Sequence, residues 1–276
     1  MKTIVTVQDL SCYGKCALMN AVPVLDVMGL SASVLPTALL SAHTGFPRVH
    51  ARDLTEDMDL ILDRWEADGI RFDSALCGYL ASPAQAAAVE RLFRDFTRGL
   101  KILDPAMGDN GRLYRGVDRG MADAVRRLAG TSDVIIPNLT EAAELTGTAY
   151  CEAPGHDMIL ELLRALTALG PAAAVITGIP GEGGTIGAAG LFKGAPEDRG
   201  TYCEAFSPRY PLSWHGTGDL FAACLAGALV RGQSPEEAVS LSVRFVAEAI
   251  RVSPSDPSLE RHGVHFEKVL SMLLPG

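Results

Sequence analysis

The sequence has no excess of positive charge and no long apolar run free of charged residues. Its 24 lysines and arginines are outnumbered by 33 aspartates and glutamates, which gives a formal net charge of −9. This balance argues against nucleic acid or an anionic membrane surface as a general partner. The chain turns polar at Gln8 and Asp9, too early for a signal peptide, and no stretch approaches the length that spans a bilayer. The sequence therefore predicts a cytoplasmic protein.

Cysteine and histidine are too scattered to indicate a metal site or a disulfide framework. The six cysteines are spread over the chain, which in a cytosolic protein usually means free thiols. Cys12 and Cys16 have a spacing loosely like that of a zinc site, but no second pair follows them. The six histidines form no helix face with an acidic partner. The sequence therefore indicates no transition metal.

The chain also lacks a low-complexity linker, a detectable internal repeat and a run of like charges. Its 276 residues are many for one domain but lie within the range of a single α/β layered structure. Hydrophobic residues make up 48% of the chain, an ordinary globular composition that can bury a large core. We therefore expect residues 1–276 to form one domain.

Short β-branched runs alternate with longer segments of helical period. Strands are expected at residues 4–7, 32–35, 74–77, 101–103, 134–136 and 173–177, and an antiparallel edge hairpin at 187–192 with 201–206. Helices are expected at residues 17–28, 54–67, 83–96, 117–129, 140–145, 156–169, 235–252 and 259–274. Pro36 is expected to stop the second strand, and Ser82 to cap the helix that follows it. The alternation predicts a mainly parallel sheet covered by helices on both faces.

Ligands of an open parallel sheet bind at the carboxyl ends of its strands, where polar and glycine residues gather in this chain. These strand-end segments are residues 8–11, 36–45, 78–79, 104–109, 137–141 and 177–178. Together, Asp104, Asp109, Glu141 and Asp219 could hold Mg²⁺ on one rim, directly or through waters, beside a nucleotide. Turn formation accounts for some of these residues as well, since Asp104 can shape a turn before Pro105 and Glu141 can cap a helix.

A glycine motif, Gly216-Thr217-Gly218-Asp219, precedes the apolar run 220–230. Glycines let the backbone approach an anion closely, and a helix that begins at Gly218 or Asp219 directs unpaired N–H groups and a positive dipole end toward it. Asp219 in the first turn is favoured in its charged form and can accept a hydroxyl proton during phosphoryl transfer. Taken alone, such a short motif is more often a tight turn with an aspartate cap.

Six segments in order resemble those of the vitamin B6 kinases, the pyridoxal and pyridoxamine kinases of the ribokinase superfamily. They are Val7-Gln8 with Tyr13-Gly14, His43-Thr44, Gly78-Tyr79-Leu80-Ala81-Ser82, Asp104-Pro105-Ala106-Met107-Gly108, Pro137-Asn138-Leu139-Thr140-Glu141 and Gly216-Thr217-Gly218-Asp219. The resemblance runs over nearly the whole chain. It implies a ribokinase-like three-layer α/β/α fold without a separate lid domain, a homodimer, and ATP-dependent phosphorylation of the 5′-hydroxymethyl group of pyridoxamine, pyridoxal or pyridoxine. It also implies Mg²⁺ and, in many members, K⁺.

The resemblance further implies roles for individual residues. Asp219 would take the proton from the 5′ hydroxyl, and the anion hole for the transferring phosphoryl group would be Gly216, Thr217 and Gly218. The ATP side would consist of Asp104, Asn138, Glu141, Thr177 and Gly178. On that side Asp104 and Glu141 would serve Mg²⁺. The pyridine pocket would consist of Asp9, Ser11, Thr44 and Tyr79.

Two positions depart from the pattern of the B6 kinases. Many members carry serine after the glutamine of the first strand, where this chain has Asp9. A carboxylate in a partly dry pocket is expected to favour a cationic ring nitrogen or the 4′-ammonium of pyridoxamine over the neutral aldehyde of pyridoxal. Gly45 stands where related enzymes often carry a polar residue, so a contact to the 3-hydroxyl of the ring is not carried over. His43 and His215 flank the pocket, where a structural role is commoner than a catalytic one.

Three other functions stay open. Hydroxymethylpyrimidine kinases of thiamine synthesis share the single-domain plan and the anion-hole glycines, but commonly carry cysteine in place of Asp219. Sugar and nucleoside kinases usually insert a lid hairpin early, and no such insertion is visible before Leu54. A non-catalytic B6-binding module would lose the base or the phosphate glycines, and both are present. The residues therefore favour an enzyme that binds ATP and a B6 vitamer.

Overall fold

A nine-stranded sheet forms the centre of the molecule in the computed structural model, which describes residues 1–194, 200–212, 214–254 and 256–274. The strand order is β11-β10-β9-β8-β5-β4-β1-β2-β3. In chain order the strands are β1 (Thr3–Ser11), β2 (Ser31–Leu40), β3 (Ala51–Asp53), β4 (Ser74–Cys77), β5 (Lys101–Leu103), β8 (Val134–Ile135), β9 (Ala173–Gly181), β10 (Thr185–Phe192) and β11 (Thr201–Pro208). The six neighbouring strands β2, β1, β4, β5, β8 and β9 are parallel to one another. The strand β3 pairs antiparallel with β2, and β10 pairs antiparallel with β9.

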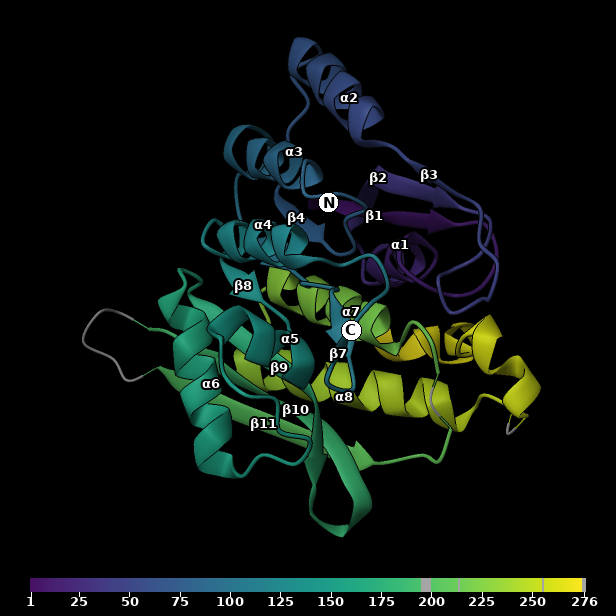
Figure 1. The fold of residues 1–276 in the computed structure, drawn as a ribbon, viewed down its shortest axis with the longest axis vertical. Helices are drawn as coiled ribbons and strands as arrows, with labels where there is room; N and C mark the ends of the chain where they lie inside the picture. Colours follow the sequence, from purple (N-terminus) through teal and green to yellow (C-terminus); the bar gives the residue numbers. More distant parts are fainter. Residues whose placement is uncertain (195–199, 213, 255, 275–276) are drawn as a thin grey trace.

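Helices cover both faces of this sheet (Figure 1). They are α1 (Leu18–Val27), α2 (Thr55–Ala67), α3 (Gln85–Arg91), α4 (Arg119–Ala129), α5 (Leu139–Thr146), α6 (His156–Ala168), α7 (Thr217–Arg231) and α8 (Pro235–Arg251). Shorter turns are the π-helix η1 (Leu92–Phe96) and the 3₁₀ segments η2 (Glu182–Gly184), η3 (Pro257–His262) and η4 (Phe266–Leu273). One hydrophobic core packs α2 to α6 on the sheet, and a second packs α1, α7, α8 and η4 on the other face.

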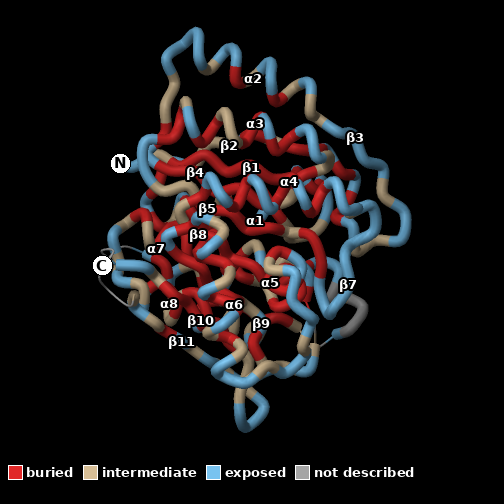
Figure 2. Tube along the Cα trace, turned by 60° about the vertical axis from the view of Figure 1, so that its left-hand side comes forward, coloured by how far each residue is buried: buried red, intermediate tan, exposed pale blue. Residues whose placement is uncertain are grey.

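The central strands are apolar on both faces because each face meets a layer of helices. In β1 the side chains of Val5 and Val7 join the core under α2 to α6, while Ile4 joins the core under α1, α7 and α8. Figure 2 shows the resulting band of buried residues through β1, β4, β5 and β8, with α2 largely exposed at the rim. The predicted parallel sheet, its two helical layers and its antiparallel hairpin are thus confirmed. No helix among the described residues has the length and apolarity to cross a membrane.

The second strand was predicted to stop at Pro36, but β2 continues to Leu40. Pro36 pairs with Gln8 of β1, and β3 begins to pair with β2 only at Ala38. A proline interrupts a sheet only where its nitrogen would have to donate to a neighbouring strand. Because β3 pairs beyond that point, the strand passes through the proline intact.

Two predicted helices are also corrected. The helix over 83–96 begins as α3 at Gln85, and the hydroxyl of Ser82 lies 2.9 Å from Thr55 Oγ1 instead of capping it. The helix expected over 259–274 is divided into η3 and η4 by Gly263, whose φ is +83° and whose Cβ would lie 2.4 Å from Lys15 Cβ. A side chain at that position would meet both a backbone penalty and a clash, so the chain turns there.

Candidate active site

A pocket of about 130 Å³ lies at the carboxyl ends of the central strands. It is lined by Asp104, Ala106, Tyr114, Ile136, Asn138, Glu141, Thr177, Gly216, Gly218 and Asp219. They come from the segments after β5, β7 (Arg112–Leu113) and β8, from α5 and β9, and from the start of α7, so segments more than a hundred residues apart meet here. Seven of the predicted site residues are therefore brought together: Asp104, Asn138, Glu141, Thr177, Gly216, Gly218 and Asp219.

The start of α7 forms one wall of this pocket. Gly216 is the N-cap residue with φ 82°, and a Cβ on it would lie 2.1 Å from the carbonyl oxygen of Lys15. The helix begins at Thr217, slightly earlier than predicted, and the Thr217 hydroxyl donates back to the carbonyl of Trp214 at 3.3 Å. The first N–H groups of a helix have no intrahelical acceptor, and the 15 residues of α7 align their dipoles toward this end. A helix start of this kind is the geometry in which proteins often bind anions.

Asp219 lies at the base of that wall. Its Oδ2 accepts the backbone N–H of Ala17 at 2.8 Å. Enclosure of the carboxyl raises its pKa to about 7, the Ala17 hydrogen bond acts against this rise, and the charge of Asp9 adds to it. A carboxylate that titrates near neutral pH is suited to act as a general base.

Two further carboxylates lie in the pocket. Burial raises the pKa of Asp104 well above its usual range, and the charges of Glu141 and Asp219 raise it further. Glu141 has a pKa of about 7 because of burial, although its oxygens accept N–H groups from Met107 (2.9 Å), Gly108 (3.4 Å) and Asn138 (2.9 Å). The Asn138 side chain in turn caps α5. Glu141 therefore does cap a helix, and it still faces the pocket.

These carboxylates suit a metal ion that keeps most of its waters. The described residues contain no group of three or more histidine, cysteine, aspartate or glutamate side chains placed to hold a metal, so they form no all-protein cage. Mg²⁺ in phosphate-transfer sites is usually held by one or two carboxylates, waters and the phosphates themselves. The repulsion that raises the pKa of Asp104 beside Glu141 would be relieved by a cation. The pair fits the predicted ion in this form.

The residues predicted to bind the pyridine lie outside the 130 Å³ pocket. At the end of β1, Ser11 Oγ donates to Asp9 Oδ2 at 2.9 Å, and both residues are buried. Burial raises the pKa of Asp9, and its charge in turn raises the pKa values of Tyr79 and Asp219. The charge of Asp9 therefore acts on both Tyr79 and Asp219, the predicted base. Thr44 is exposed in the loop after β2.

Thr217 and Gly178, the two remaining predicted residues, do not line the pocket either. Thr217 offers its backbone N–H at the helix start, as described above. Gly178 is exposed, adopts φ 72°, and has no atom within 4 Å of the position of a Cβ. Both positions adjoin pocket residues in the chain, Gly218 and Thr177 respectively.

Tyr114 lines the pocket and was not predicted. It follows the small hairpin of β6 (Gly108–Asp109) and β7 (Arg112–Leu113), and its N–H donates to the carbonyl of Met107 at 2.8 Å. The turn residues Asn110 and Gly111 have φ values of 51° and 72°, as in a type I′ turn. An Asn-Gly pair is a strong hairpin signal, and it could have revealed this element from the sequence. Ala106 and Ile136 also line the pocket without having been assigned a role.

The rings of the two histidines beside the pocket, His43 and His215, pack together at a tilt of 40°. Their ring centroids are 4.8 Å apart. In His43, Nδ1 accepts the N–H of Gly45 at 3.1 Å and Nε2 lies 2.6 Å from the carbonyl oxygen of Arg261, so Nε2 must carry the proton. With both nitrogens engaged, His43 is structural: it fastens the loop after β2 to the C-terminal segment η3.

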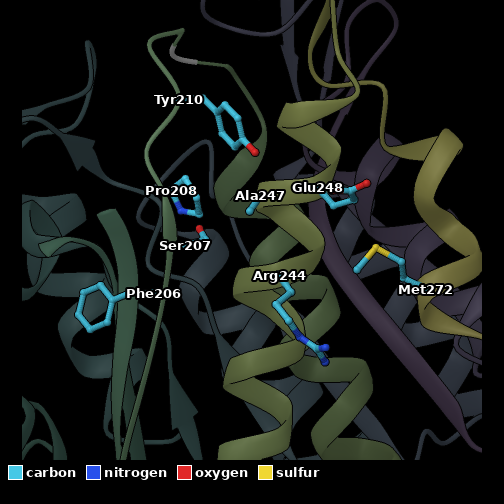
Figure 3. Close-up of a pocket in the computed structure, with 8 residues that line it drawn as sticks. All are labelled: Phe206, Ser207, Pro208, Tyr210, Arg244, Ala247, Glu248 and Met272. Carbon is cyan, nitrogen blue, oxygen red and sulfur yellow. The ribbon is translucent and has the colours of Figure 1, made fainter. Parts of the chain in front are cut away.

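A larger hollow of about 510 Å³ lies elsewhere, between the end of β11, α8 and η4 (Figure 3). Its walls are Phe206, Ser207, Pro208, Tyr210, Arg244, Ala247, Glu248 and Met272. Glu248 there is already paired with Arg251 at 2.6 Å. None of the predicted site residues is among these eight, so the paired carboxylates and the glycine turn belong to the smaller pocket.

Comparison with known proteins assigns this arrangement to a family. A family model described as phosphomethylpyrimidine kinase matches residues 6–264, and the chain belongs to this family of kinases. A pyridoxine/pyridoxal/pyridoxamine kinase of Bordetella avium (strain 197N) is 31% identical over 256 residues, covering 90% of this chain and 84% of the relative.

Solved structures agree with this assignment. The crystal structure of pyridoxal kinase from Lactobacillus plantarum is 33% identical, with a TM-score of 0.89 over 99% of this chain and 96% of that chain. A protein from Bacteroides thetaiotaomicron, provisionally named a phosphomethylpyrimidine kinase and crystallised with pyridoxal, is 34% identical with a TM-score of 0.93 over 99% and 95% of the two chains. The predicted relationship to the B6 kinases, the ribokinase-like fold and the kinase class are confirmed.

Proposed function

We propose that the chain transfers the γ-phosphoryl group of ATP to the 5′-hydroxymethyl group of a B6 vitamer. One observation carries this proposal: the Asp219 carboxyl, with a pKa of about 7, stands beside an open helix start and in one pocket with Asp104 and Glu141. The relatives from Bordetella avium and Lactobacillus plantarum, named as kinases of these vitamers, support it.

In the proposed reaction Asp219 is the base. Ala17 holds Oδ2, which leaves Oδ1 to accept the proton of the substrate hydroxyl as its oxygen attacks the γ-phosphorus and ADP leaves. The N–H groups at the start of α7, from Gly216 to Gly218, would stabilise the negative charge of the transferring group. Positioning and charge stabilisation supply most of the rate in such transfers.

The nucleotide side of the pocket would consist of Asp104, Asn138, Glu141, Thr177 and Gly178. When bound, Mg²⁺ would neutralise phosphate charge, and Asp104 and Glu141 would hold it through waters. From the family resemblance we also propose that the chain uses K⁺ and forms a homodimer, and the cytoplasmic location expected from the sequence stays a prediction. Chelation with EDTA should abolish activity and added Mg²⁺ should restore it, while activity that survives chelation would contradict the metal role.

The experiment that tests the function measures ADP release with pyridoxal, pyridoxamine, pyridoxine and hydroxymethylpyrimidine in parallel. Wild type should turn over at least one B6 vitamer, and Asp219→Asn should lose about 10²- to 10⁴-fold in kcat, the range typical for a general base. Undiminished turnover by the Asn variant would remove Asp219 as the base.

Hydroxymethylpyrimidine phosphorylation is the second candidate, because the matching family model is described as phosphomethylpyrimidine kinase. The same assay separates the two functions, since strong turnover of the pyrimidine alone would overturn the B6 assignment. A non-catalytic module is disfavoured by the base and the phosphate glycines, which line one pocket.

A further inference from the structure

Asn20, on the first turn of α1, lies against the start of α7. Its side chain is fully buried, and Nδ2 donates to two carbonyl oxygens, that of Lys15 at 3.0 Å and that of Gly216 at 2.9 Å. One amide group from α1 therefore joins the turn before its own helix to the anion-hole turn almost two hundred residues later.

The two turns are pressed together at this amide. A Cβ on Gly216 would lie 2.1 Å from the Lys15 oxygen and 2.6 Å from Asn20 Nδ2, so the turns touch without any intervening side chain. Both carbonyl oxygens carry partial negative charge, and the NH₂ group between them satisfies both. Without that donor the two oxygens would repel each other and each would lose one hydrogen bond, although the Gly216 oxygen would keep the N–H of Leu220 at 3.1 Å.

The turn before α1 also supplies the hydrogen bond to the base. Ala17 has φ 49° and ψ −125°, a conformation that residues with a side chain rarely adopt, and from it the N–H reaches Asp219 Oδ2. Such a backbone persists only when its surroundings fix it. Two residues before Ala17, the N–H of Lys15 donates to the His262 carbonyl at 3.1 Å, and the Lys15 ammonium pairs with Glu267.

We propose that Asn20 is a positioning residue for the phosphoryl transfer, whose amide holds the Ala17 N–H against the base and keeps the anion-hole turn aligned with it. The inference rests on the proposed role of Asp219 as base. Asn20 itself does not line the pocket, so its proposed effect is exerted through Ala17 and Gly216.

The proposal separates from a purely structural role through pH dependence. The Ala17 hydrogen bond is the contact that lowers the pKa of Asp219 against the effect of burial. Its loss would raise that pKa above about 7 and shift the acid limb of kcat/KM to higher pH. Four other titratable groups interact with Asp219 through their charges. They are Asp9 from β1, Cys16 from the turn before α1, Asp104 after β5 and Tyr114 after β7. A substitution at Asn20 leaves all of them in place.

The test compares wild type with Asn20→Ala and Asn20→Asp across pH 5–9. Both variants should lose about 10- to 100-fold in kcat, with KM for either substrate changed less than about threefold, as expected when orientation is lost. The acid limb of Asn20→Ala should move upward by about half a pH unit or more. Asn20→Ser, which keeps one donor, should lie between wild type and Asn20→Ala, and it is the variant to measure if Asn20→Ala does not fold.

Leu166→Ala is the matched control, because Leu166 is fully buried in the core on the opposite face of the sheet. It should lower Tm at least as much while leaving the acid limb unmoved. If Asn20→Ala lowers Tm but retains the kcat and the acid limb of wild type, the positioning role is overturned. Asp219→Asn, assayed in parallel, distinguishes the failures, since full activity in that variant would overturn the base assignment itself.

Discussion

The Asp219 carboxyl is subject to two opposing effects at the scale of a single residue. Enclosure favours its neutral form, whereas one N–H from Ala17 favours its charged form, and the balance places its pKa at about 7. A base needs its charged form, so a small change in either effect alters the fraction of active enzyme at neutral pH.

The pH dependence of kcat/KM should follow from this value. Below about pH 7 the rate constant should fall about tenfold per pH unit, because protonated Asp219 cannot accept the hydroxyl proton and kcat/KM reports the free enzyme. The measurement is ADP release at low substrate from pH 5 to 9. Glu141→Gln is a useful companion, since Glu141 also has a pKa of about 7 and its removal should leave the Asp219 limb in place. A profile flat down to pH 5 would contradict the assignment.

Asp9 should decide which vitamer is preferred. It is buried with Ser11 as its hydrogen-bond donor, and its charge reaches both Tyr79 and Asp219. Replacing Asp9 by Ser should lower the ratio of kcat/KM for pyridoxamine to that for pyridoxal by about tenfold, which corresponds to about 1.4 kcal/mol of lost charge pairing. Asp9→Asn, which keeps the shape, should behave alike. An unchanged ratio in both variants would show that the ring's cation is recognised elsewhere.

Several site residues could be predicted from sequence because the topology brings local motifs together. Asp104 and Asn138 follow parallel strands, which end at one edge of the sheet, and Thr177 lies within β9, where a parallel bridge joins it to Asn138. Ala17 and Asn20 could not be predicted in this way. Their roles depend on contacts with α7 across about two hundred residues, and no local pattern indicates which N–H will face a carboxylate.

At the scale of elements, the start of α7 contains two glycines with different reasons to be glycine. Gly216 has a left-handed backbone and no room for a Cβ, so it is required by the fold. Gly218 has no atom within 4 Å of a Cβ position and lines the pocket, so the fold tolerates a methyl group there. The space beside Gly218 is the space that the transferring phosphoryl group is proposed to occupy.

Alanine at the two positions should therefore give opposite results. Gly218→Ala should leave Tm unchanged or slightly raised, since alanine is the better helix former, while kcat/KM falls at least about tenfold. Gly216→Ala should lower Tm sharply, because the methyl group meets the Lys15 carbonyl. Thermal unfolding and ADP release on both variants check this pair. Full activity in Gly218→Ala would show that no group binds close to that wall.

Element boundaries were predicted least well where tertiary contacts override local signals. Pro36 reads as a strand stop, yet the pairing of β3 starts beyond it. Residues 259–274 show a helical period, yet Gly263 packs against Lys15 and divides the segment. Both corrections come from the neighbour that each segment meets, which a window of sequence does not contain.

At the scale of the whole molecule, the buried carboxylates make stability depend on pH. Asp9, Asp104, Glu141 and Asp219 all have raised pKa values, so between about pH 4 and pH 7 the folded chain binds more protons than the unfolded chain. Stability from these groups is then highest at low pH and falls as pH rises through the folded pKa values. These groups therefore contribute least to stability at neutral and higher pH, where the proposed base is charged.

Removing one of these charges should stabilise the free protein at high pH. Asp219→Asn should raise the free energy of unfolding at pH 8 by on the order of 1–4 kcal/mol, and by much less at pH 5, because the amide needs no charge to be desolvated. Denaturant unfolding of both proteins at the two pH values measures this. An equal effect at pH 5 and pH 8 would show that the pKa of Asp219 is not raised in the folded chain.

The order of strands and helices along the chain also determines at which stage of synthesis the active site can form. The strands β1, β2 and β4 are complete by Cys77 and lie side by side, so they can pair early. The helix α7 begins only at Thr217, and until it leaves the ribosome the apolar face of α1, with Ala21, Val24 and Leu25, lacks the partner that covers it in the finished core. A growing chain therefore passes through a long stage in which it is inactive and exposes sticky surface. Interrupted translation before α7 would therefore yield inactive fragments, which are substrates for chaperones and proteases.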